Sequence, residues 1–334
     1  MKIILDAMGG DYAPQQQVLG GCMAAEQMGI DMVLCGDQAA IKKELDAYNG
    51  SKARISVRHC TERIENEDDP IRSVRRKKDA SLVVGLQMLK DKEGDAFVCS
   101  GNTGALIASS TFTLGRLESV ERPALTPILP SMKGPLALLD AGANTHCDPK
   151  NLVQFGIMGT YFMNKVMGVE NPRVGLINIG VEEKKGTKLT KEAYPLLKQA
   201  AIDFVGNIEG RNIPYGDADV LVADGFTGNV VLKLMEGMGK FISNELKNIF
   251  MKNAMTKLSS VMVQGGLKDL KRKMDYKEYG GAPLLGVDGI VIKAHGSSDA
   301  RAVFHAIGQA KKAVDTNLIQ LLKDNLKGSD QNRD

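Results

Sequence analysis

Apolar and polar positions alternate along the chain in a pattern that predicts strands followed by helices. Several short apolar runs each end in a polar loop that in most cases contains glycine, and apolar positions with helical spacing follow most of these loops. The six clearest runs, with their loops, cover residues 3–12, 97–110, 136–144, 174–180, 220–234 and 290–299. Strands that alternate with helices in this way predict an α/β fold with parallel or mixed sheets.

A proline-rich segment divides the predicted fold into two lobes. Its prolines are Pro123, Pro127, Pro130 and Pro135. They exclude a continuous helix and indicate a crossover, so we expect two Rossmann-like lobes with a cleft between them. The first lobe comprises residues 1–118 and 290–334, and the second comprises residues 119–289. Within the second lobe, apolar residues at helical spacing predict a helical arm at about 237–276.

The junction at residues 97–110 predicts an anion-binding site. Its sequence, FVCSGNTGALIASS, is typical of a strand, a tight loop and a helix. Such a loop gathers unpaired backbone N–H groups at a helix N-terminus, where glycine permits close approach and the helix dipole favours negative charge. For one such loop, an ordinary turn of a parallel sheet is the better interpretation. Six loops favour ligand binding, because open sheets bind ligands at the carboxyl ends of their strands.

These loops supply the candidate residues for binding phosphate or another anionic substrate. The candidates are Asp6, Gly9, Gly10, Gly101, Asn102, Thr103, Gly104, Asn144, Asn229 and Ser297. Asp6 is expected to orient loop amides rather than to act as a base. Side chains of Asn, Thr, Ser, Lys and His hold anions and stabilise developing negative charge without a covalent intermediate. The residues therefore favour acyl or phosphoryl transfer by positioning.

Four further residues are candidates for catalysis. Lys184, Lys185 and Asn178 lie at or after the end of the strand predicted at residues 174–179, in a loop without the spacing of a Walker A motif. His295 lies in the sequence HGSSD, after the last predicted strand. A catalytic role for His295 and a structural hydrogen bond to its neighbouring loop are both open.

Composition narrows the classes of function. The 334 residues carry a net charge of +3, no tryptophan and 5% aromatic residues, which argues against a nucleic acid partner. Five widely spaced cysteines include no CxxC pair, so a reducing cytosol fits better than a disulfide framework or a zinc site. No carboxylate and histidine cluster has metal-ligand spacing, so neither a metal nor a cofactor is expected. The chain opens on KIIL without a leader, and no apolar run is long enough to span a bilayer.

Two basic segments are candidate partner surfaces. The first is either a solvated face or a site that receives an acidic partner. Its residues are Arg72, Arg75, Arg76 and Lys77. The second is the predicted arm, where an apolar tip between basic flanks is typical of an interfacial membrane contact, with packing against a second subunit as the alternative; both can hold together. Its candidates are Leu258, Val261, Met262, Lys271 and Arg272.

Five motifs resemble one known family. The chain contains, in order over nearly its full length, DAMGGD, SGNTGA, LDAGAN, DGFTGN and HGSSD. In these motifs it resembles the PlsX family, the phosphate acyltransferases of bacterial phospholipid synthesis. The resemblance implies transfer of a long-chain fatty acyl group from acyl carrier protein to inorganic phosphate, giving acyl phosphate for a downstream membrane acyltransferase. It also implies a two-lobed homodimer whose fold is similar to isocitrate and isopropylmalate dehydrogenases and to phosphotransacetylase.

The resemblance and the residues together give a mechanistic hypothesis. Phosphate lies among the loop amides, with Lys184 or Lys185 supplying charge and Lys184 preferred. One phosphate oxygen attacks the thioester carbonyl, and a lysine or His295 stabilises or protonates the departing thiolate. We expect the protein in the cytoplasm, peripherally associated with the anionic membrane. The alternatives are a phosphotransacetylase that acts on acyl-CoA, a hydroxyacid dehydrogenase, for which no aspartate metal cluster is found, and a non-catalytic scaffold for acyl carrier protein and membrane.

Overall fold

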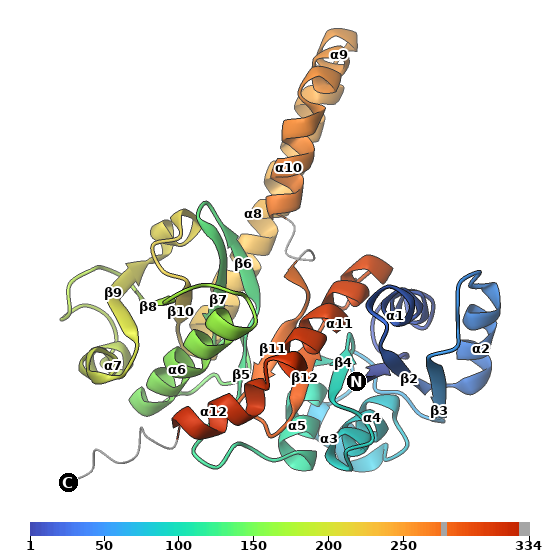
Figure 1. Cartoon of the computed structure of the whole chain (residues 1–334). Coiled ribbons are helices and arrows are strands. Elements are labelled where there is room, and N and C mark those ends of the chain that lie inside the picture. The colour runs from blue at the N-terminus through green and yellow to red at the C-terminus, as the bar shows by residue number, and fades with distance from the viewer. Residues whose placement is uncertain (275–278, 327–334) are drawn as a thin grey trace.

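The computed structural model describes residues 1–274 and 279–326, without the side chains of residues 271–274. The chain forms two lobes side by side, from which a helical arm projects (Figure 1). Each lobe contains one β-sheet with helices packed on it. This arrangement confirms the predicted α/β fold class with two sheets.

The first sheet has seven strands in the order β3-β2-β1-β4-β12-β11-β5. Their bounds are β1 (Lys2–Asp6), β2 (Asp31–Gly36), β3 (Ile55–His59), β4 (Ala96–Cys99), β5 (Ala124–Leu125), β11 (Ala282–Leu285) and β12 (Ile290–Lys293). The strands from β3 to β12 pair in parallel, whereas β11 is antiparallel to both β12 and β5. Strands β1, β4 and β12 are buried almost throughout because apolar clusters pack on both faces of this sheet.

The second sheet has five strands in the order β6-β7-β10-β8-β9. Their bounds are β6 (Ile128–Ser131), β7 (Gly134–Leu139), β8 (Arg173–Asn178), β9 (Asp203–Glu209) and β10 (Val220–Val222). Strand β6 is antiparallel to β7, and the remaining pairs are parallel. The division between the sheets differs from the predicted boundaries, because β5 and β11 fall within residues 119–289 and yet pair with the first sheet. Both strands are short, and the positions of the prolines do not predict which sheet they join.

Helices cover both sheets. Those of the first lobe are α1 (Gln15–Met28), α2 (Gln38–Ala47), α3 (Pro70–Arg76), α4 (Ser81–Lys90), α5 (Thr103–Thr113) and α11 (Ala300–Asp315). Those of the second lobe are α6 (Pro149–Lys165), α7 (Lys188–Gln199) and the 3-10 helix η1 (Gly210–Tyr215). The last helix, α12 (Leu318–Leu326), packs against α6, so the C-terminal part of the chain reaches the second lobe.

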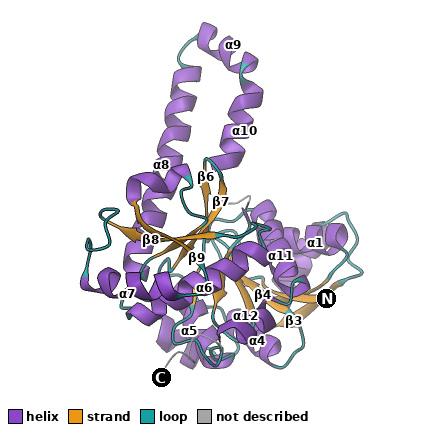
Figure 2. Cartoon of the chain, turned by 60° about the vertical axis from the view of Figure 1, so that its left-hand side comes forward, coloured by secondary structure: helices purple, strands orange, loops and turns teal. Residues whose placement is uncertain are grey.

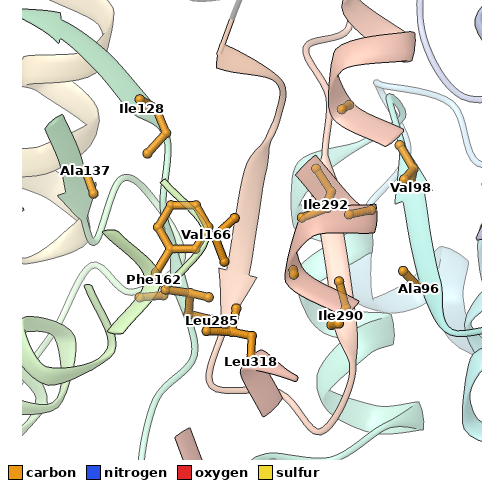
Figure 3. Close-up of a cluster of buried hydrophobic side chains, with 14 of the residues drawn as sticks. Ala96, Val98, Ile128, Ala137, Phe162, Val166, Leu285, Ile290, Ile292 and Leu318 are labelled. Atoms are coloured by element: carbon orange, nitrogen blue, oxygen red, sulfur yellow. The ribbon is translucent and has the colours of Figure 1, made fainter. Parts of the chain in front are cut away.

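One hydrophobic core continues from the first lobe into the second. Figure 3 shows Leu318 of α12 and Leu285 of β11 close to Phe162 of α6 and to Val166, which directly follows α6. All four side chains are buried, and Phe162 is completely inaccessible to solvent. Because burial of apolar surface stabilises the folded state, this packing holds the two lobes together beyond the chain connections.

The arm consists of three helices (Figure 2). They are α8 (Gly225–Met251), α9 (Ala254–Met262) and α10 (Gln264–Met274). Helix α8 begins inside the second lobe and leads outward, α9 lies at the far end, and α10 returns. The arm thus starts within α8, a helix that also borders the cleft described below, from its second turn at Asn229 onward. In the described ranges, no helix is both long and apolar enough to cross a membrane.

Candidate active site

A cleft lies between the two lobes, at the carboxyl ends of strands from both sheets. It encloses a cavity of about 330 Å³. Polar residues at its wall include Thr103, Gly104, Gly142, Asn229, Lys293 and His295. Apolar residues at its wall include Ile107, Leu125, Ile128 and Leu232. Open α/β sheets bind ligands in this position, and the mixed lining suits a ligand with one anionic and one apolar part.

Helix α5 presents its N-terminus to the cleft. Asn102 caps the helix by accepting a hydrogen bond from the N–H of Ala105 at 2.9 Å. The same side chain donates to the carbonyl of Asn66 at 3.0 Å and so fixes the preceding loop. Thr103 and Gly104, the first two residues of α5, line the cavity. The N–H groups of this first turn lack acceptors within the helix, so the positive end of the helix dipole lies at the cleft.

The loops after β1 and β4 pack closely against each other. Asp6 accepts a hydrogen bond from the thiol of Cys99 at 3.1 Å, and burial raises the pKa of its carboxyl group. A Cβ atom at Gly9 would lie 2.6 Å from Oδ2 of Asp6 and 2.7 Å from the backbone nitrogen of Gly101. Gly10 has a φ of +107°, which side chains rarely adopt. Asp6 and the three glycines therefore shape the loops, and in the described part of the chain none of them lines the cavity.

Two motifs of the second lobe bring α8 against the end of β7. Asp140 is fully buried, burial raises the pKa of its carboxyl group, and Oδ2 accepts the backbone N–H and the side-chain amide of Asn144 at 2.6 and 2.9 Å. Asn144 also donates to the carbonyl of Pro123 at 2.7 Å, so its side chain fixes this loop. A Cβ atom at Gly228 would lie only 1.9 Å from the carbonyl oxygen of Asp140. This close packing places the next residue, Asn229, at the cleft.

Lys293 is a cationic residue of the cleft that the sequence analysis missed. It ends β12, its side chain is buried, and Nζ donates to the carbonyls of Ser100 at 3.3 Å and of Ala294. Burial lowers the pKa of its ammonium group. The sequence did contain a signal, since this lysine ends the otherwise apolar run IVIK of a strand that must be buried. Lys233 and Glu236, also missed, line the opposite wall 3.0 Å apart and follow Asn229 at helical spacing.

His295 contacts both its own loop and the cleft. Its Nδ1 accepts the backbone N–H of Ser297 at 3.1 Å and lies 2.9 Å from the hydroxyl oxygen of that residue. Because a backbone N–H can only donate, Nδ1 of the neutral ring is unprotonated and Nε2 carries the proton. Burial lowers the pKa of the imidazole, which favours this neutral form. The loop hydrogen bond thus uses Nδ1, and Nε2 is the nitrogen that can donate a hydrogen bond. Ser297 orients the ring, while its neighbour Ser298 lines the cavity.

The other three predicted catalytic residues lie elsewhere. Lys184 and Lys185 are exposed, and Lys184 borders a separate surface pocket with Lys198. Asn178 donates to the carbonyl of Lys185 at 3.1 Å and to the side chain of Asn207 at 3.1 Å. Among the described residues that line the cleft, none of the three occurs. Lys184, Lys185 and Asn178 lie at the end of β8 or in the loop after it. In the sheet, β10 lies between β8 and β7, so this loop is farther from the first lobe than the loop after β7.

The basic cluster lies on α3, which packs against α5. Arg75 is placed over the ring of Phe112 at 5.8 Å from its centroid. Lys77 pairs with Asp68 at 2.6 Å, whereas the side chains of Arg72, Arg75 and Arg76 extend the charged surface. Exposed Ile71 and Phe112 lie within this region, where they are 51% and 56% accessible. The cluster is therefore a mixed surface of cations and apolar side chains beside the cleft helix α5.

The arm exposes apolar side chains along its length and at its end. On α8, Val230, Leu234 and Phe241 are more than half accessible. At the tip, Leu258 is 68%, Val261 65% and Met262 85% accessible. Lys271 and Arg272 belong to α10, but their side chains lie outside the described part of the chain. These side chains are exposed together on one element, unlike the singly scattered apolar residues of an ordinary surface.

The described residues contain no group of three histidine, cysteine, aspartate or glutamate side chains arranged to hold a metal ion.

Known proteins resemble this chain over nearly its full length. The family model described as "Fatty acid synthesis protein" matches residues 1–321. A phosphate acyltransferase of Alkaliphilus oremlandii is 52% identical over 320 residues, which cover 96% of each chain. A phosphate acyltransferase of Thermoanaerobacterium thermosaccharolyticum is 50% identical over 319 residues, covering 96% of this chain and 95% of that protein. Among solved structures, a phosphotransacetylase from Streptococcus pyogenes superposes with a TM-score of 0.65 at 12% identity and 94% coverage of both chains, which confirms the predicted similarity of fold.

Proposed function

The chain belongs to the fatty acid synthesis protein family, the PlsX phosphate acyltransferases, and from this premise we propose that it moves a long-chain fatty acyl group from acyl carrier protein to inorganic phosphate. The family and its relatives make the protein an acyltransferase of fatty acid and phospholipid synthesis. The proposal adds the donor, acyl carrier protein, and the product, an acyl phosphate that a downstream membrane acyltransferase uses.

The observation that supports the proposal most directly is that the cleft has one polar side and one apolar side. Its polar side combines the N-terminus of α5, at Thr103 and Gly104, with the side chains of Asn229 and His295. Backbone N–H groups at a helix N-terminus and amide donors are suited to a phosphate ion. The cleft also has an apolar wall, which includes Ile107, Leu125, Ile128 and Leu232. This wall is suited to the first part of an acyl chain.

The chemistry requires no covalent enzyme intermediate. A phosphate oxygen attacks the thioester carbonyl, a carbon–oxygen bond forms, and the carbon–sulfur bond breaks with its electron pair remaining on sulfur. Asn229 and the amides of α5 stabilise the negative charge of the tetrahedral intermediate. The N–H at Nε2 of His295 is positioned to stabilise the departing thiolate with a hydrogen bond, and the thiolate then takes its proton from water. Lys184 and Lys185 lie outside the cleft, so we assign them no step at the reacting atoms.

The surface on α3 is the proposed docking site for acyl carrier protein. Arg72, Arg75 and Arg76 supply positive charge for an acidic partner, and exposed Ile71 and Phe112 supply apolar contact. Because α3 packs on α5, a donor bound there has its acyl group close to the cleft. Charge complementarity of this kind accelerates association and makes its rate fall with rising salt.

The arm is the proposed site of assembly and membrane contact. The apolar stripe of α8, which includes Val230, Leu234 and Phe241, is suited to the same stripe of a second copy in a homodimer. The tip, with Leu258, is suited to the interface of an anionic membrane, since Lys257 and Lys268 lie near it. The protein is then cytoplasmic and peripherally bound where its lipid product is used.

Incubation with long-chain acyl carrier protein and phosphate tests the proposed function. A chelator is present, and hydroxylamine traps acyl phosphate as the hydroxamate. The proposal expects hydroxamate that depends on both phosphate and acyl carrier protein. Turnover with acetyl-CoA but not with acyl carrier protein would contradict the proposed donor. Absence of turnover with both donors would point to the non-catalytic scaffold.

A further inference from the structure

Lys293 occupies an unusual position for a lysine. It aligns with Cys99 of β4, and the thiol of Cys99 donates to the carboxylate of Asp6 at the end of β1, so these side chains form one row across the first sheet. The row ends at the cleft, where Lys293 contributes to the cavity wall. The residue is only 8% accessible to solvent. A lysine is almost never buried to this extent unless other groups pair with its ammonium group.

The hydrogen bonds of Nζ to the protein use only some of its N–H donors. An ammonium group has three N–H donors, and in the described structure two of them meet the carbonyls of Ser100 and Ala294. Both carbonyls belong to the first residues after β4 and β12, where the loops of the cleft begin. The ammonium group is therefore held at the cavity by its own sheet, with a donor left for a ligand there.

We propose that Lys293 is the residue that binds the phosphate substrate by direct charge-assisted contact, in the place that the sequence analysis gave to Lys184. The inference deepens the proposed function and rests on it. Lys293 shares the cavity with the first turn of α5, which directs N–H groups to the same space. A cation and a helix N-terminus on one wall bind an anion with both point charge and aligned donors.

Two other lysines are weaker candidates for this contact. Lys233 lines the opposite wall, but its side chain is 58% accessible and pairs with Glu236. Lys184 is exposed beside a separate pocket. Water and counter-charge weaken the attraction of both to an anion, whereas a buried ammonium is screened far less. The low exposure of Lys293 therefore makes its contact with phosphate the stronger one.

The groups around Lys293 offset the effect of burial only in part, so its pKa stays lowered before phosphate binds. Burial lowers the pKa of Lys293, while Cys99, Asp6 and Asp11 act in the opposite direction and Lys233 acts with burial. Phosphate adds negative charge on the cavity side. Binding of phosphate consequently favours the charged form of Lys293.

The test compares Lys293→Met and Lys293→Arg with a matched control, Lys311→Met. Lys311 pairs with Asp315 on the far part of α11 and lies outside the cleft lining. Two quantities are measured: the KM for phosphate in the acyl transfer assay, and the rise in Tm that inorganic phosphate produces without an acyl donor. For Lys293→Met we expect a roughly 10- to 100-fold higher KM for phosphate, because the variant loses one charge-assisted hydrogen bond to phosphate. The KM for the acyl donor and the Tm without phosphate identify any general structural effect.

The outcomes separate this inference from the proposed function. A phosphate-induced rise in Tm for the wild type and for Lys311→Met, lost in Lys293→Met and partly kept in Lys293→Arg, supports Lys293 even if no acyl transfer is found. An active wild type with an unchanged KM for phosphate in folded Lys293→Met overturns the inference and leaves the function standing. If Lys293→Met does not fold, Lys293→Gln takes its place, and an unchanged phosphate response in Lys293→Gln with the wild-type KM overturns the inference equally.

Discussion

Replacement of Gly228 by alanine tests the way in which the second lobe positions Asn229. The new Cβ would lie 1.9 Å from the carbonyl oxygen of Asp140, where ordinary contacts begin at 3.4 Å. Roughly 1.5 Å of movement is therefore needed between α8 and the end of β7. The carbonyl of Asp140 is part of the backbone, which cannot rotate away as a flexible side chain can. The strain adds to the overpacking cost of about 1–3 kcal/mol that extra core atoms impose.

Two opposing effects decide the stability of the variant. Alanine favours a helix over glycine by about 1 kcal/mol, which offsets part of the strain. Gly237→Ala is the matched control, because Gly237 lies on the same helix and a Cβ there would meet no atom of the described residues within 4 Å beyond the backbone of its own helix. We expect Gly237→Ala to raise the free energy of unfolding by about 1 kcal/mol and Gly228→Ala to lower it.

The same movement displaces Asn229 from the phosphate and the tetrahedral intermediate. A misplacement of about 1 Å can lower the rate on the order of 100-fold. Chemical denaturation gives the stability, and kcat/KM for acyl transfer gives the positioning. If Gly228→Ala were as stable and as active as Gly237→Ala, the close packing of α8 on β7 would have no role in building the site.

Four further predictions follow from individual side chains. Lys184→Ala tests the sequence-based hypothesis of a catalytic lysine: because Lys184 lies outside the cleft lining, we expect unchanged kcat and KM, whereas a strong loss of turnover in folded protein would support that hypothesis. Charge reversal of Arg75 and Arg76 to glutamate should lower kcat/KM for acyl carrier protein and flatten its dependence on salt, and a salt-insensitive wild-type rate would count against charge steering. Leu258→Glu should reduce binding to vesicles that contain anionic lipid without changing turnover of soluble substrates, and full retention on vesicles would place the membrane contact elsewhere. Burial lowers the pKa of Lys293, so its ammonium loses its proton at a lower pH than an ordinary lysine does. As the pH is raised, the KM for phosphate of the wild type should therefore begin to increase earlier than the pKa of an ordinary lysine would give. A wild-type KM that stays constant at alkaline pH, as it does in Lys293→Met, would contradict this.

The sequence predicted the parts of the fold that depend on local pattern. Strands with apolar runs, such as β4 and β12, and the start of α5 after the glycine loop lie where the pattern places them. Local signals were sufficient because a buried strand needs apolar residues and a helix N-terminus needs a capping residue such as Asn102. Strand β5 has only two residues, and its pairing with β11 depends on tertiary packing that no local pattern records.

The candidate site was predicted less completely, because sequence order does not give distance between loops. Thr103, Gly104, Asn229 and His295 do border the cleft. Asp6, Asn144 and the glycines around them instead hold the loops in place through buried hydrogen bonds and close contacts. A loop rich in lysine drew attention to Lys184, whereas the lysine at the cleft ends an apolar strand. A single charge in a strand buried on both faces is the more specific signal, since its burial requires compensation.

The most direct test of the account uses phosphate labelled with heavy oxygen and follows the label by mass spectrometry. If phosphate attacks the thioester, the fatty acyl phosphate released from acyl carrier protein contains the labelled oxygens, including the one that bridges carbon and phosphorus. The account predicts this product and an equal amount of free carrier thiol. Release of unlabelled fatty acid with no acyl phosphate would show that water attacks the thioester, and would contradict the assignment of the cleft to phosphate.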